Sequence, residues 1–128
     1  MQRLLHLLVI GCVLLIGACR AAPIYNVESA PLNAPPTATL ADIQRAIIRA
    51  GSTRGWQMTP VEPGHVVATY ARRDFTTSVD IRFTTQSYSI TYKDSTGLNY
   101  DGTEIHSNYN AWIHNLQTDI QNQVAALY

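Results

Sequence analysis

The chain has 128 residues, with nine basic and nine acidic side chains, four histidines and two cysteines. This length suits one domain. The balanced charge offers no basic surface of the kind that binds nucleic acid, so we expect no nucleic-acid partner.

Residues 1–18 have the pattern of an export signal. Arg3 supplies a positive charge, and an almost wholly apolar run follows from Leu4 to Ala18. This run of about 15 residues is shorter than the roughly 20 that a membrane-spanning helix needs. The pattern therefore predicts a cleaved signal rather than a permanent membrane helix.

The end of this run, Ile16-Gly17-Ala18-Cys19, resembles the lipobox of bacterial lipoproteins. The resemblance implies cleavage between Ala18 and Cys19, lipidation of Cys19 and, because Arg20 rather than Asp follows, an outer-membrane anchor with the protein facing the periplasm. Lipidation at two sites already holds a protein stably on a membrane. The alternative is an ordinary signal peptide in which Cys19 plays no part.

Residues 19–37 are expected to form a lipid-anchored, proline-rich tether. Four prolines interrupt the segment, and no periodicity is sustained. Proline fixes φ and favours extended neighbours, so a partly stiff spacer is predicted between the anchor and a single domain over residues 38–128. With Cys12 in the signal and Cys19 lipidated, no disulfide stabilises that domain.

The domain is predicted to be α+β, beginning with one amphipathic helix. Thr39 and Asp42 have the spacing of a capping box, and Gly51 is expected to end the helix. Alternating strands then follow from Trp56, over 65–72, over 75–83 and over 87–92.

A second helix is expected to begin near Ser107 or Asn108 and to carry an apolar stripe through Leu127. Short connections between the strands predict a four-stranded antiparallel meander. The expected order is α-β-β-β-β-α in two layers, with both helices packed on one face of the sheet.

No catalytic motif was found, and we expect no enzymatic activity and no cofactor. His65, His106 and His114 lie outside any spacing that a paired metal site would need, and each is interpreted as a surface or boundary residue. Asp94, Asn99, Asp101 and Glu104 gather oxygen ligands in one loop. That loop lacks the register of a calcium-binding EF-hand, so an ion site there stays an open question.

Two groups of residues are candidates for a binding surface. The first is the polar face of the sheet, with its short side chains. This face, or an edge strand of the sheet, is a candidate for pairing with another envelope protein by strand addition. The second is an arginine cluster suited to phosphate, formed by Arg72 and Arg73 with Arg82 as a further candidate member. The favoured alternative for these arginines is a solvated hairpin in which Asp74 and Asp80 pair with them. The residues are Thr76, Ser78, Ser89 and Thr91 for the face, and Arg72, Arg73 and Arg82 for the cluster.

The helix ending "AGSTRGW", the alternating strands and the closing "IHSNYNAWIHNLQTDI" are similar to small lipoproteins of Gram-negative bacteria. That family has no established activity to carry over. We therefore expect a non-catalytic binding or assembly accessory of the cell envelope, with an envelope protein as partner. The alternatives are a module that binds lipid, glycan or peptide and, less favoured, a small envelope hydrolase.

Overall fold

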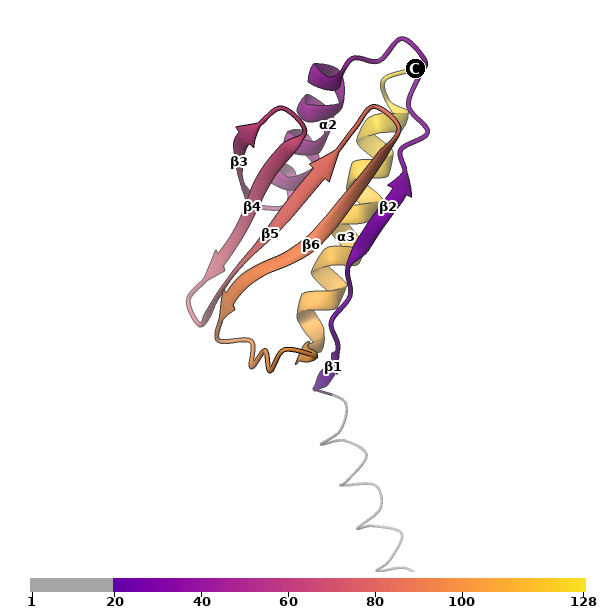
Figure 1. The fold of residues 1–128 in the computed structure, drawn as a ribbon. Helices are drawn as coiled ribbons and strands as arrows, with labels where there is room; N and C mark the ends of the chain where they lie inside the picture. The colour runs from indigo at the N-terminus through magenta and orange to yellow at the C-terminus, as the bar shows by residue number, and fades with distance from the viewer. Residues whose placement is uncertain (1–19) are drawn as a thin grey trace, which may run out of the picture.

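The fold is α+β, as predicted, and it is built on one antiparallel sheet. The structure, a computed structural model, describes residues 20–128; the predicted signal and Cys19 lie outside the described residues. Five strands form the main sheet in the order β2-β6-β5-β4-β3, and β1 pairs with β7 in a separate two-stranded sheet. Both helices, α2 and α3, lie behind the main sheet in Figure 1, and the opposite face is uncovered.

Four of the five strands follow one another in the predicted meander. They are β3 (Gln57–Glu62), β4 (His65–Arg72), β5 (Phe75–Phe83) and β6 (Ser87–Thr96), each antiparallel to the next. Their alternation is also as predicted, because Val79, Ile81 and Phe83 are buried toward the helices. Tyr88 and Ile90 on β6 continue the same apolar layer.

The predicted tether is wrong for residues 20–37, and so is the count of four strands. β1 (Ala21–Pro23) pairs with β7 (Glu104–His106), and β2 (Val27–Pro31) pairs with β6 as the fifth strand. Val27 and Leu32 are each only 3% exposed within the core. The domain therefore includes β1 and β2 and does not begin at residue 38, because these side chains complete the apolar layer.

Helix α2 (Leu40–Thr53) begins as predicted and ends later than predicted. Thr39 and Asp42 form the capping box, with each side chain accepting a hydrogen bond from the other's backbone N–H. Gly51 lies inside the helix and not after it. Its missing side chain makes room for Met58 of β3, whose sulfur occupies the place where a Cβ would stand.

Helix α3 (Ser107–Ala125) lies behind the sheet next to α2 (Figure 1). Its buried positions are Tyr109, Ile113, Leu116, Ile120 and Val124, all within the stripe predicted from the sequence. Two other members of that stripe, Trp112 and Leu127, are only partly buried, and Leu127 lies beyond the end of the helix. The cap differs from the prediction, since His106 Nδ1, and not Ser107 or Asn108, accepts the N–H of Asn108 at 3.2 Å.

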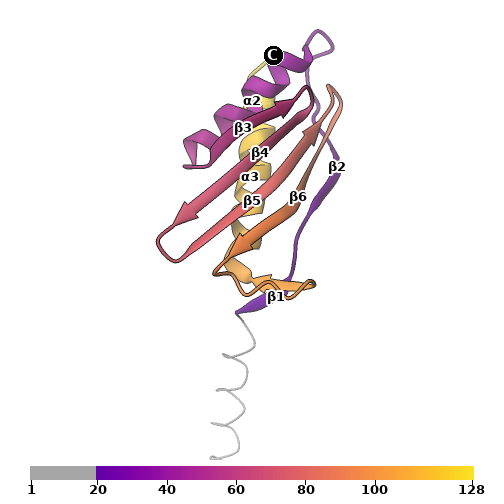
Figure 2. The ribbon, with the colours of Figure 1, turned by 60° about the vertical axis from the view of Figure 1, so that its left-hand side comes forward.

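The two ends of the described chain lie at opposite ends of the domain, as Figures 1 and 2 show. The first described residue already belongs to the fold, because the carbonyl oxygen of Arg20 accepts the N–H of Ser107 at 3.0 Å. The start of α2 and the end of β3 lie at the far end of the domain, the end that also holds the C-terminus.

Replacing Tyr109 with Phe is expected to leave the domain as stable or to stabilise it by up to about 1 kcal/mol at neutral pH. The Tyr109 hydroxyl is fully buried and has no hydrogen-bond partner in the described part of the chain, and this burial raises its pKa well above the ordinary value of 10. The raised pKa means that the native chain loses stability as the pH rises past 10, because unfolding exposes a hydroxyl that ionises more easily. Urea denaturation at pH 7 and pH 10.5 tests this: a clear loss of stability for Y109F at pH 7 would contradict it.

Candidate functional site

The uncovered face of the sheet brings together five of the seven predicted surface residues. Register places Arg82 opposite Ser89, and Asp80 opposite Thr91. On the other side of β5, Thr69 of β4 lies opposite Ser78, with their hydroxyls 2.9 Å apart. The five are Thr76, Ser78, Arg82, Ser89 and Thr91.

A histidine–carboxylate contact and an arginine–carboxylate ion pair lie within this hydroxyl-rich face. His65 Nε2 lies 2.7 Å from Asp80 Oδ1, and Arg82 Nη1 lies 3.9 Å from the other carboxylate oxygen. The side chains of His65 and Asp80 are each 13% exposed, so His65 is more enclosed than a surface residue beside a turn. A histidine with a carboxylate forms part of a nucleophilic triad, but no hydroxyl within residues 20–128 hydrogen-bonds to this ring.

The predicted arginine cluster is not formed. Arg82 lies on the uncovered face, while the guanidinium of Arg72 lies 4.2 Å above the ring of Tyr70 on the helix side. Arg73 is exposed in the tight connection between β4 and β5. The alternation of β4 and β5 explains the difference, because residues 72 and 82 belong to opposite faces of the sheet.

In the oxygen-rich loop after β6, the carboxylate of Asp101 stabilises a turn. Asp101 Oδ1 accepts the N–H groups of Thr103 and Glu104 at 2.9 and 2.7 Å, and these hydrogen bonds lower the pKa of Asp101. Within residues 20–128, no three His, Cys, Asp or Glu side chains are close enough to hold a metal ion.

The other two predicted histidines lie apart from the His65 pair. His106 caps α3, and the ring of His114 stacks on Tyr25 with the ring centroids 4.0 Å apart. Neither ring contacts Asp80 or Arg82. None of the three histidines marks the strongest candidate for a binding site, which lies at another place in the fold.

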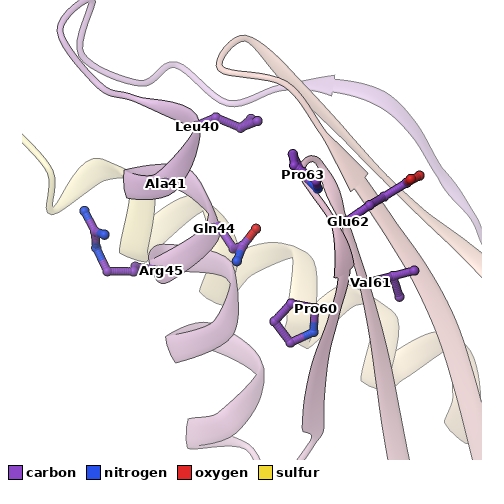
Figure 3. Close-up of a pocket in the computed structure, with 8 residues that line it drawn as sticks. All are labelled: Leu40, Ala41, Gln44, Arg45, Pro60, Val61, Glu62 and Pro63. Atoms are coloured by element: carbon purple, nitrogen blue, oxygen red, sulfur yellow. The ribbon is translucent and has the colours of Figure 1, made fainter.

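That candidate is a groove between the first turns of α2 and the outer edge of β3, shown in Figure 3. Its volume is about 440 Å³, within the range of about 300–1,000 Å³ that is usual for ligand sites. In Figure 3, Gln44 and Pro60 face each other across the groove, while Arg45 and Val61 turn away from it. The lining residues are Leu40, Ala41, Gln44, Arg45, Pro60, Val61, Glu62 and Pro63.

This groove runs beside a free strand edge. β3 ends the five-stranded sheet, and no strand within the described residues pairs with its outer side. All of its residues except Met58 are exposed, and Val61 is 56% exposed. The opposite edge, β2, is a poorer template for pairing. Both edges carry a register shift, but only β2 also has a residue with positive φ, Ser29.

Sequence reasoning raised the idea of an edge strand but did not find this groove. Its lining residues form no sequence motif, and only the packing of α2 against β3 and the turn after it brings them together. No helix within residues 20–128 is long and apolar enough to span a membrane. No protein family, curated protein or solved structure matches the chain in comparisons with known proteins.

Proposed function

We propose that this protein is a membrane-anchored lipoprotein of the Gram-negative envelope that binds an extended segment of another envelope protein, without catalysis. The anchor rests on the lipobox-like residues 16–19, with the lipid on Cys19 and the protein facing the periplasm from the outer membrane. The binding role rests on the free edge of β3 beside the groove under α2.

A partner strand added beside β3 would contact both the free strand edge and the groove. Its backbone would hydrogen-bond along β3, and its side chains would alternate between the two faces of the enlarged sheet. One set would enter the groove against Leu40 and Gln44, and the other would lie beside Thr59 on the polar face. Backbone pairing supplies affinity in this mode, and the groove supplies selectivity.

The edge also carries features that limit indiscriminate pairing. Pro60 has no N–H to donate, the register shifts between Pro60 and Glu62, and Glu62 brings a charge. A partner strand must therefore align its own hydrogen-bonding groups around a missing donor. This requirement favours one register and one sequence over general strand pairing.

Filling the groove is expected to abolish partner binding without unfolding the protein. Ala41 is exposed on the first turn of α2 and lines the groove, so Ala41→Trp places a large side chain where the partner's side chains would lie. Ala111→Trp, at an exposed position in the first half of α3, is the matched control. The assay is recovery of the tagged full chain from host membranes after photo-crosslinking from position 61.

The expected result is one crosslinked envelope protein that is retained with A111W and reduced at least about tenfold with A41W. Hydrogen exchange of β3 should slow in the purified complex, because strand addition occupies its outer amides. Equal recovery with both variants, or unchanged exchange in β3, would refute the groove. Separately, unaltered processing and membrane attachment of Cys19→Ser would refute the lipid anchor.

A further inference from the structure

An aromatic cluster lies on the helix side of the sheet, away from the β3 groove. Helix α2 ends at Thr53, and Trp56 follows it into contact with Tyr70 of β4, with ring centroids 5.2 Å apart. Trp112 of α3 lies 5.4 Å from Tyr70 and stacks on Phe75 at 4.6 Å. Trp56 is buried, whereas Tyr70, Phe75 and Trp112 keep part of their surface exposed.

Part of this cluster forms a small hollow with a polar rim. The hollow has a volume of about 100 Å³ and is lined by Arg54, Trp56, Tyr70, Trp112 and Asn115. Arg54 donates to both carboxylate oxygens of Asp119, at 2.6 and 3.4 Å, which fixes the guanidinium at the rim. Asn115 is an exposed residue of α3, one turn after Trp112.

The charges around the hollow discriminate between classes of ligand. A cation would meet the guanidinium groups of Arg54 and Arg72, and the latter already occupies the cation position over Tyr70. An anion would meet the carboxylate of Asp119, which already neutralises Arg54. A neutral ligand with one apolar face and several hydroxyl or amide groups meets no opposing charge.

We propose that this hollow is a binding site for a neutral oligosaccharide. The C–H face of a sugar ring would lie against the part of Trp112 that its stacking on Phe75 leaves exposed, and a ring substituent would enter the hollow beside Tyr70. Asn115 would donate and accept hydrogen bonds with that substituent, since its amide offers both groups. Ligand sites commonly combine aromatic walls with a few such placed polar groups. The site is independent of the proposed strand-binding groove.

The two tryptophans allow a direct test, because Trp56 and Trp112 are the only tryptophans in the chain. The full-length protein is held in a poly(oxyethylene) detergent, which carries neither sugar nor charge. Tryptophan emission is then followed during titration with chitotetraose, maltotetraose, phosphocholine and a tetragalacturonate. We expect a saturable change with at least one of the two neutral oligosaccharides and none with the charged probes.

Asn115→Ala is expected to weaken this binding about three- to tenfold, through the loss of one or two hydrogen bonds. Asn122→Ala, an exposed asparagine two turns further along α3, is the matched control and should bind as the native chain does. Both substitutions favour the helix equally. No response to either neutral sugar, a response to phosphocholine or galacturonate alone, or equal weakening by both variants would overturn the proposal.

Discussion

Deleting residues 21–36 from the full chain is expected to prevent the domain from folding. The deletion removes β1 and β2, together with the buried side chains of Val27 and Leu32. Each such side chain contributes about 1.5–3 kcal/mol on burial, so the two account for about 3–6 kcal/mol before any strand hydrogen bond is considered. A domain of this size has a total stability of about 5–15 kcal/mol, and the loss consumes much of it.

The measurement is urea denaturation followed by circular dichroism. A chain that begins at Arg20 serves as the control and should unfold cooperatively, because every described strand remains in it. Two further hydrogen bonds join the deleted segment to the rest of the domain. Asn110 Oδ1 accepts the N–H of Tyr25, and Asn26 Oδ1 accepts the N–H of Tyr92. Cooperative unfolding of the deletion variant with native stability would restore the idea of a tether.

Gly97→Ala is expected to destabilise the domain by about 2–5 kcal/mol, through a left-handed backbone and a backbone collision together. Gly97 has a φ of +78°, and an added Cβ would collide with the carbonyl oxygen of Asp74 and lie 3.1 Å from the Cα of Phe75. The obstructing atoms belong to the backbone of the β4–β5 turn, so no side-chain rotation relieves the contact.

Gly102→Ala measures the cost of the left-handed backbone alone, without a collision. Gly102 has a φ of +101°, and an added Cβ meets nothing within 4 Å. Its substitution should cost only about 1–2 kcal/mol in the same urea experiment. Equal losses for G97A and G102A would show that the loop after β6 does not press on the β4–β5 turn.

The elements that could be predicted from the sequence are those whose structure follows from a local periodicity of apolar residues. The stripe of α3 and the alternation of β5 each follow from one face meeting the core, and both are confirmed by burial. β1 and β2 were missed because they are short, contain Pro23 and Pro31, and pair with strands about 60 to 85 residues further along the chain. Periodicity carries no signal of such distant pairing.

The candidate sites were predictable only in part, for a related reason. The polar face follows from alternation, so its hydroxyl residues could be placed together from the sequence. The supposed arginine cluster failed because Arg72 and Arg82, on neighbouring strands, belong to opposite faces of the sheet. The groove and the aromatic hollow each join a helix to a distant strand, as Ala41 with Pro60 and Trp112 with Tyr70 illustrate.

The hydrogen bond that holds Arg20, the first described residue, to the folded domain sets a geometric limit on the proposed anchor. If Cys19 carries the lipid, no free chain separates the bilayer from the folded body, because Arg20 is already hydrogen-bonded to Ser107. The groove beside β3 lies at the end of the domain opposite Arg20. The 19 residues of α3 span about 28 Å along this length. The folded body itself would then hold the groove at a set height above the membrane, so that capture of a partner at that level needs no fluctuating linker.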